Sequence, residues 1–431
     1  MRILHVSTRL IIGGSQENTV LSCEGQARLG HEVHLAFGPI YGPEGSLLDR
    51  VESFRTNESE PPAGAGGRLR TEVDLESDPL LPQGAQKGER RGAITTHVVP
   101  SMIRAINPLA DVRCYFQLKR LIRALEPDIV HTHSSKAGII GRAAAWRVCK
   151  RSKTGRPAVI HTIHGPPFHK YQSRLLNLIY TVAERFAAKR CHTIVSVADA
   201  MTEQYLARRI GRREQYVTVR SGIETELFLE AANPHNRTRV RDELNLDEDD
   251  FVIGTVARLA ELKGHDDLLD ALADDLGENP GWKLLWVGGG WWKDRLLRRV
   301  GELGLQRQVV TTGLVEPERV PDMLAAMDIL AHPSYREGLP RPVVQALLCG
   351  VCPVAYDVDG TREICVEMET GRRVKPGDIE ALRGAVRWAA RCPDERREMA
   401  GRGRSMCSIA YSAQTMVHEL EQVYADALDR A

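Results

Sequence analysis

The chain of 431 residues contains no apolar stretch long enough to cross a bilayer, and its net charge at pH 7 is only +1. A membrane-spanning helix needs about 20 consecutive apolar residues, so we expect none. The small net charge gives no reason to expect nucleic acid as a partner. The first residues, MRILHVS, lack the charged lead, long apolar core and cleavage site of a signal peptide. We therefore predict a first β-strand there and a cytoplasmic location.

A disulfide framework is also missing. The nine cysteines are scattered and odd in number, whereas disulfide-bonded domains usually carry an even number at regular spacing. We interpret them as reduced thiols. Cys349 and Cys352 form a C-x-x-C, but a redox or zinc role would need a helix amino terminus or a second pair. The pair instead falls at a predicted helix-to-strand turn.

Strand patterns that alternate with helix patterns fill most of the chain, and its length suits two domains. The first half contains the predicted strands RILHVST, HEVHLAFG, DIVHTH, VIHTIHG, TIVSVA and YVTVRSGI. The second half contains FVIGTVA, KLLWVGG, QVVTTG, DILAHPS and CPVAYD. This alternation predicts an α/β fold with two doubly wound parallel sheets.

Residues 336–347, REGLPRPVVQAL, give the strongest indication of a site. They follow a predicted buried strand, so Glu337 lies where a strand ends and a helix begins. Backbone N–H groups at such a junction favour anions; those of Gly338 and Leu339 can face a phosphate or sugar oxygen. Glu337 can accept hydrogen bonds from the hydroxyls of a polyol. Pro340 suits the first helical turn because it has no N–H. An ordinary strand-turn-helix unit is the alternative.

Two cations follow an earlier strand of the same half. The run FVIGTVA ends near Arg258, and Lys263 precedes a predicted amphipathic helix. Residues at the carboxyl ends of parallel strands converge on the crevice where α/β sheets bind ligands. Arg258 supplies a planar fork of donors and Lys263 a mobile point charge, which suits a departing diphosphate that no metal neutralises. Two solvated surface cations are the alternative.

Four segments of the second half resemble the nucleotide-sugar domain of glycosyltransferase family 4 in order and spacing: VARLAELKGHDDLLDA, LLWVGGGWW, VVTTGLVE and MDILAHPSYREGLPRPVVQALLCGVCPVAYDVDG. Three earlier segments resemble the acceptor-side domain of that family: ILHVSTRLIIGGSQENTV, EPDIVHTHSSKAGIIGRAAA and VIHTIHGPPFHKYQ. The resemblance covers nearly the whole chain.

The resemblance implies the GT-B fold, in which two Rossmann-like doubly wound domains face a cleft. It implies an acceptor-side domain over 1–218, a nucleotide-sugar domain over 219–408, and a C-terminal helix over 409–431 that returns to the first domain. Residues 56–93 fall outside the pattern because they are rich in glycine, proline and charge without an apolar period. We predict a disordered insert there, with an acceptor-specific lid as the alternative.

The resemblance further implies a retaining, metal-independent transfer from a nucleotide-diphosphate sugar to a glycan or lipid-linked acceptor in cell-surface polysaccharide synthesis. No cofactor is expected, and a peripheral contact with the inner membrane face would fit. The implied catalytic residues are His164, Arg258, Lys263 and Glu337. The implied donor-binding residues are Gly13, Gly14, Gly288, Val315, Gly338, Leu339, Pro340 and Gln345.

Gly13 and Gly14 separate the first predicted strand from the first helix. Glycine allows a ligand to approach the backbone closely, and the helix start offers a positive end. The spacing is not G-x-G-x-x-G, so a simple tight turn is the alternative.

Four histidines, His131, His133, His161 and His164, lie at two predicted strand ends. Such a group can ligate zinc, but carboxylates that often complete a zinc site are missing nearby, so we predict no metal site. In the resembling family, His164 lies on the floor of the cleft, where a histidine can make a polar contact or move a proton. His161, at the start of a predicted strand, is interpreted as structural.

The chain departs from the family pattern at two places. The family carries a second glutamate eight positions after the first, which binds the ribose; here Gln345 stands there, and an amide loses the charge-assisted strength. Trp291 and Trp292 stand where small or polar residues are usual, and they either wall the nucleotide pocket or cover the sheet. Asp357 and Asp359 form a D-x-D, the metal signature of a different transferase fold, which we discount.

Two rival functions remain. A nucleotide-sugar epimerase of the same fold would need carboxylates in the cleft to move a proton, and no added acidic pair is found. A catalytically weak sugar-nucleotide-binding protein is the other rival, because Gln345 replaces the family's glutamate.

Overall fold

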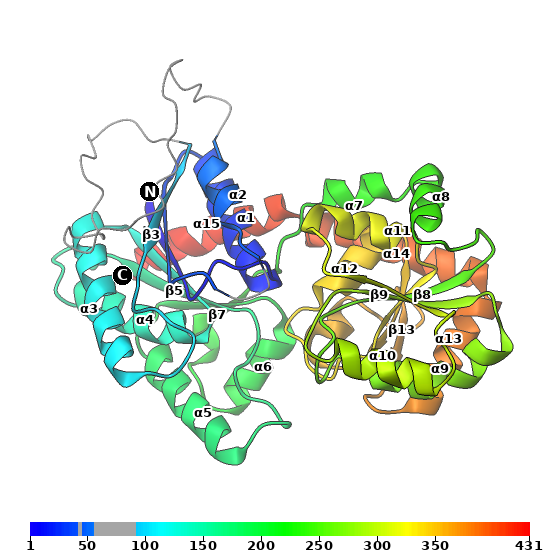
Figure 1. The fold of residues 1–431 in the computed structure, drawn as a ribbon. Coiled ribbons are helices and arrows are strands. Elements are labelled where there is room, and N and C mark those ends of the chain that lie inside the picture. The colour runs from blue at the N-terminus through cyan, green and yellow to red at the C-terminus, as the bar shows by residue number, and fades with distance from the viewer. Residues whose placement is uncertain (42–44, 56–91) are drawn as a thin grey trace. The chain divides into compact units, whose positions relative to one another are not determined.

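The computed structural model describes residues 1–41, 45–55 and 92–431. These residues form two compact units (Figure 1). Unit 1 comprises Met1–Gly222 with Met416–Ala431, and unit 2 comprises Ile223–Thr415. Residues 56–91, which make up nearly all of the predicted insert, lie outside the described part of the chain.

Unit 1 is built on a parallel sheet with the strand order β3-β2-β1-β4-β5-β6-β7 among its described residues. The strands are β1 (Arg2–Ser7), β2 (Glu32–Phe37), β3 (Ile94–Val98), β4 (Ile129–His133), β5 (Ala158–Ile163), β6 (Thr193–Ser196) and β7 (Tyr216–Thr218). Successive strands run outward in opposite directions from the β1–β4 pair, whose register joins Ile3 to Ile129 and His5 to His131. The carboxyl end of that pair is therefore a topological switch point, where sheets of this class bind ligands.

Helices cover both faces of the unit 1 sheet (Figure 1). They are α1 (Gly14–Arg28), α2 (Leu48–Ser53), α3 (Pro108–Leu125), α4 (Ser135–Cys149), α5 (Arg174–Ala188), α6 (Asp199–Ala207) and α15 (Ala413–Asp429). Side chains of β1 and β2 alternate between two buried clusters: Leu4 and Val6 belong to one, and Val33 and Leu35 to the other. This alternation follows from the two-residue period of a strand.

Local signals set the helix boundaries. Asn107 caps α3 by accepting the backbone N–H of Ala110, and Pro108 supplies a first helical residue with no N–H to satisfy. Helix α15 lies against α1, and a Cβ at Gly25 would collide with Val417. Glycine at that position therefore allows the two helices to approach closely.

Unit 2 repeats the architecture. In the described part its sheet has the order β10-β9-β8-β11-β12-β13, with β8 (Phe251–Val256), β9 (Trp282–Val287), β10 (Val309–Gly313), β11 (Ile329–His332), β12 (Cys352–Tyr356) and β13 (Arg372–Val374). The helices are α7 (Thr225–Ala231), α8 (Pro234–Glu243), α9 (His265–Glu278), α10 (Lys293–Glu302), α11 (Val320–Ala325), α12 (Arg341–Leu348), α13 (Ile379–Arg391) and α14 (Pro393–Ala410). The switch point of this sheet lies between β8 and β11.

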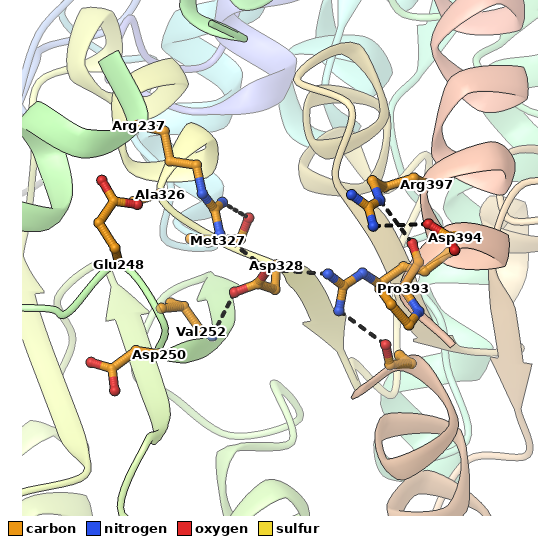
Figure 2. Close-up of polar contacts among 12 residues, drawn as sticks. Arg237, Glu248, Asp250, Val252, Ala326, Met327, Asp328, Pro393, Asp394 and Arg397 are labelled. Carbon is orange, nitrogen blue, oxygen red and sulfur yellow. Dashed lines mark hydrogen bonds and ion pairs between the residues drawn. The ribbon is translucent and has the colours of Figure 1, made fainter. Parts of the chain in front are cut away.

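Asp328, directly before β11, joins two helices of unit 2 to its sheet (Figure 2). Its carboxylate accepts hydrogen bonds from Arg237 at 3.0 Å and Arg241 at 2.8 Å, both on α8, and from Arg396 of α14 at 3.1 Å. It also accepts the N–H of Val252, the second residue of β8, at 2.9 Å. Arg241 is fully buried, so one carboxylate neutralises a guanidinium that has no access to water.

The predicted α/β fold with two parallel sheets is confirmed, and each predicted strand of both halves is present. Two local predictions are wrong. Pro340 precedes helix α12 as its N-cap, and Pro342 occupies the first turn instead. His161 lies inside β5 and not at its start. No described helix is long and apolar enough to cross a membrane.

Candidate active site

A lysine and a glutamate meet at the switch point of unit 2. Lys263 follows β8 and Glu337 follows β11, and the two strands are paired. Lys263 Nζ lies 2.6 Å from Glu337 Oε1 and 3.4 Å from Ser334 Oγ. The side chains are 23% and 14% exposed, so the pair is largely shielded while one side stays open to a ligand.

The surroundings keep Glu337 ionised. Burial alone would raise the pKa of this carboxyl, but the charge of Lys263 and the ring of His332 outweigh that effect and hold the pKa well below its ordinary value. His332 is buried at the end of β11, and its Nε2 lies 3.2 Å from Glu337 Oε1. Glu337 is therefore a permanent hydrogen-bond acceptor with a fixed orientation.

The loop that carries Lys263 is held by its backbone. Leu262 and Gly264, on either side of the lysine, both adopt left-handed conformations, with φ of 63° and 73°. The Leu262 carbonyl accepts the N–H of Tyr335 at 2.9 Å, which ties this loop to the one that follows β11. A Cβ at Gly264 would collide with the carbonyl of Pro333. Glycine at 264 is required both by its φ and by this close approach.

The D-x-D aspartates have structural partners. Asp359 Oδ2 accepts the backbone N–H of Glu337 at 2.8 Å, and its own φ of 42° turns the chain so that the contact forms. Asp357 lies 3.2 Å from Arg362 and 3.7 Å from Arg373. Asp359 therefore supports the loop of Glu337. The sequence indicated only the D-x-D pattern of a metal signature at this residue and not this supporting role.

The two tryptophans after β9 lie in different surroundings: one covers the sheet and the other is exposed. Trp292 packs against the hydrophobic core of unit 2, with the Arg295 guanidinium 4.3 Å from its ring centre. Trp291 is 66% exposed, and its ring centre lies 5.9 Å from the guanidinium carbon of Arg258. Arg258 is itself exposed and makes no ion pair with a described acidic residue.

The other predicted donor-binding residues of unit 2 lie in loops or on α12. Gly288 follows β9 with φ 136°, and a Cβ there would collide with the Ala257 carbonyl. Val315 lies in the loop after β10. Gly338 and Leu339 precede α12, and Gln345 lies half-buried on it. Among the described residues, the Gln345 side-chain amide has no hydrogen-bond partner, so it is available to a ligand.

In unit 1, the predicted residues follow β1 and β5. Gly13 is the N-cap of α1, and its carbonyl accepts the N–H groups of Gln16 and Glu17 at 3.0 and 2.9 Å. Gly14 is the first helical residue. His164 follows β5, and its Nε2 lies 3.1 Å from Nδ1 of His133.

A cluster of histidines lies next to His164, and its members are not the four histidines that the sequence grouped together. His5, His131 and His133 offer three ring nitrogens within 4.8 Å of one another, and all three side chains are buried. His161 faces α4 instead, because a Cβ at Gly138 of that helix would collide with the His161 ring. Its Nδ1 lies 3.0 Å from Thr132 Oγ1 of β4. His5 appeared in the sequence only as one residue of an apolar strand, so nothing there marked it as a member of the cluster.

Two family models match the chain in succession. The Glycosyl transferase 4-like domain matches residues 13–222, and Glycosyl transferases group 1 matches residues 236–406. The UDP-Gal:alpha-D-GlcNAc-diphosphoundecaprenol alpha-1,3-galactosyltransferase of Escherichia coli is 26% identical over 298 residues, 68% of this chain and 74% of that protein. The capsular polysaccharide biosynthesis glycosyltransferase CapM of Staphylococcus aureus is 23% identical over 331 residues, 76% of this chain and 84% of that protein.

The fold has solved counterparts. Anabaena Alr3699/HepE, crystallised with UDP and glucose, matches with a TM-score of 0.75 at 19% identity, over 99% of each chain. The two-sheet architecture is that of the GT-B glycosyltransferases. With both family models matched in order along the sequence, the chain belongs to the family 4, group 1 glycosyltransferases.

Proposed function

We propose that this glycosyltransferase moves a sugar from a nucleotide-diphosphate sugar to an acceptor hydroxyl, with retention of configuration and without a metal or other cofactor. The Lys263–Glu337 pair is the observation that carries the proposal. Lys263 offers positive charge to a departing diphosphate, and the ionised Glu337 accepts hydrogen bonds from donor-sugar hydroxyls. Arg258, exposed beside Trp291, supplies a second cation.

The remaining roles follow from position. Gly288, Val315, Gly338, Leu339 and Pro340 would line the sugar-phosphate contact, and Gln345 would exchange one hydrogen bond with each ribose hydroxyl. In unit 1, Gly13 and Gly14 would bring the start of α1 to an anionic group, and His164 would contact the reacting sugar. The names of the Escherichia coli and Staphylococcus aureus relatives support a glycan or lipid-linked acceptor in polysaccharide synthesis.

The proposal is tested by incubating the purified protein with a panel of nucleotide sugars in the presence of a chelator. Slow hydrolysis of one donor, undiminished by the chelator, is the expected result. Complete loss of hydrolysis that manganese or magnesium restores would contradict the metal-free mechanism. Interconversion of two sugars would indicate an epimerase, and donor binding without turnover would indicate a silent binding protein.

A peripheral membrane contact forms part of the proposal, and the outer face of α5 supports it. Five large apolar side chains on this helix are between 48% and 69% exposed: Leu175, Leu178, Ile179, Val182 and Phe186. Their spacing places them on one stripe. Residues 170–190 contain five basic residues and a single acid, Glu184. Glu184 faces inward to Arg142, 2.7 Å away, and both are buried. An apolar stripe flanked by positive charge fits an anionic lipid surface.

The substitution Leu178→Glu is expected to weaken binding to phosphatidylglycerol vesicles by about tenfold or more, because one buried leucine contributes roughly 1.5–3 kcal/mol. Co-sedimentation with vesicles measures the effect, and donor hydrolysis should be unchanged. Ile409→Glu on α14 is the matched control, since Ile409 is equally apolar and 73% exposed. Equal binding by the two variants would remove α5 as the contact.

A further inference from the structure

A continuous hydrogen-bonded chain runs beneath His164 through the core of unit 1. His164 Nε2 lies 3.1 Å from His133 Nδ1, and His133 Nε2 lies 2.9 Å from His5 Nδ1. His5 Nε2 lies 2.7 Å from the carbonyl oxygen of Gln26. The Gln26 amide nitrogen donates to Tyr424 Oη at 2.8 Å. The members come from β1, β4 and the loop after β5, from α1, and from α15.

The three inner histidines of the cluster are neutral. Burial lowers the pKa of His5 to about 4. Burial, together with the neighbouring rings, lowers the pKa of His131 and His133 well below the ordinary range. A neutral imidazole has one N–H and one acceptor nitrogen. Each histidine in the chain must therefore donate in one direction and accept from the other.

The amide of Gln26 fixes that direction. Its carbonyl oxygen can only accept, so His5 carries its proton on Nε2 and accepts at Nδ1. The same reasoning places the proton of His133 on Nε2 and then that of His164 on Nε2. When the ring of His164 is neutral, its Nδ1 is consequently unprotonated. If the amide were reversed, every proton in the chain would move to the other nitrogen.

Tyr424 is the acceptor for the amide nitrogen in this orientation. Burial raises the pKa of Tyr424 well above its ordinary value, so its hydroxyl keeps its proton. That hydroxyl accepts from the Gln26 amide and donates to His131 Nδ1, 2.7 Å away. His131 in turn reaches Thr162 Oγ1 through Nε2 at 2.6 Å. Every contact in the cluster then has one donor and one acceptor.

We propose that Gln26 and Tyr424 are positioning residues that fix the tautomer of His164, so that its Nδ1 is a hydrogen-bond acceptor toward a sugar hydroxyl. The hydroxyl as ligand rests on the function proposed above, whereas the tautomer does not. Gln26 and Tyr424 are themselves fully buried. Both act through two buried histidines, and both lie far from His164 in sequence.

The tautomers are read directly from long-range proton–nitrogen correlation spectra of protein labelled with nitrogen-15 in histidine. The signals of His164 are assigned by their absence in His164→Gln. In the wild type we expect Nε2 to be protonated and Nδ1 to be bare. In Gln26→Leu and in Tyr424→Phe we expect both nitrogens to show intermediate shifts, because the chain has lost its fixed direction.

Thr162→Val is the matched control. It perturbs the same buried cluster at similar volume, but it acts on the far side of Tyr424 and should leave the His164 shifts unchanged. Gln26→Glu retains an acceptor for His5 and should restore the wild-type tautomer. In the transfer assay, Gln26→Leu and Tyr424→Phe should lower kcat about fivefold, the equilibrium factor that one neutral hydrogen bond typically provides, with little change in donor KM.

Three results would overturn the proposal. These are a wild-type His164 protonated on Nδ1, an unchanged tautomer in both Gln26→Leu and Tyr424→Phe, or stoichiometric zinc in the purified protein, which would make His5, His131 and His133 ligands. The tautomers could behave as expected while no nucleotide sugar is turned over. In that case the function proposed for the site is wrong, and the positioning role of Gln26 and Tyr424 is still supported.

Discussion

Replacement of Lys263 by alanine is expected to lower the transfer rate by about 10²–10³-fold, the range typical of removing one contact to a developing charge. Lys263 Nζ lies 2.6 Å from Glu337 Oε1. Its loss removes positive charge from the diphosphate and leaves a shielded carboxylate without its partner. Single-turnover rates at saturating donor measure the first effect, and thermal unfolding measures the second.

The loss of stability in Lys263→Ala has a predictable dependence on pH. In the wild type the pKa of Glu337 is held below its ordinary value of 4.5, so the pair stabilises the fold above that pH and loses this contribution as the pH falls below it. In Lys263→Ala the pKa of Glu337 rises, and the ionised carboxylate then destabilises the fold because it has lost its positive partner. The stability difference between the two proteins should therefore be largest at neutral pH and shrink on acidification below about 4.5.

Two further variants separate the roles of Lys263. Lys263→Ala combined with Glu337→Gln should recover stability, because no unpaired charge remains, but it should not recover transfer. Lys283→Ala is the matched control, since Lys283 also lies near a carboxylate of unit 2, with Nζ 3.9 Å from Asp250 Oδ1. It is the second residue of β9 and lies away from the switch point. Wild-type turnover in Lys263→Ala would remove the proposed diphosphate contact.

The substitution Asp328→Asn is expected to destabilise unit 2 by about 3–5 kcal/mol, which is typical when one partner of a buried ion pair is removed. Asparagine has nearly the same shape, so the loss comes from the charge and not from a cavity. The fully buried Arg241 would keep its carbonyl contacts but lose its only carboxylate among the described residues. Arg237 and Arg396 would lose the same partner.

Urea unfolding followed by tryptophan fluorescence suits this measurement, because five of the six tryptophans lie in unit 2. Figure 2 contains the matched control: Asp394 pairs with Arg397 at 2.9 Å, but the side chains are 86% and 66% exposed. Asp394→Asn should cost no more than about 1 kcal/mol. Similar midpoints for the two variants would show that Asp328 does not anchor α8 and α14.

The sequence predicted the strands of both sheets except β3 and β13, because the predicted strands are continuous apolar runs between turn residues. The cation and the carboxylate of the candidate site were also predictable, since Lys263 and Glu337 each lie in the segment between such a run and the next helix. Their mutual contact follows from parallel topology, which brings the carboxyl ends of β8 and β11 together.

Other parts of the site depend on contacts that no local pattern encodes. Asp359 supports Glu337 through a left-handed turn 22 positions away. Gln26 bonds Tyr424 across 398 positions, and no local sequence motif marks either residue. Pro340 was placed one residue too far into α12, because a proline without an N–H suits the N-cap of a helix as well as its first turn.

Unit 1 is discontinuous in sequence, and this affects when it can fold during synthesis. Residues Met416–Ala431 complete unit 1 but leave the ribosome only after the whole of unit 2. Domains generally fold in the order of synthesis, yet here the first unit to emerge must wait for its last helix. Until Tyr424 arrives, Gln26 and His131 lack the hydroxyl that joins them. The nascent first unit therefore holds an unfinished polar core throughout the synthesis of the second.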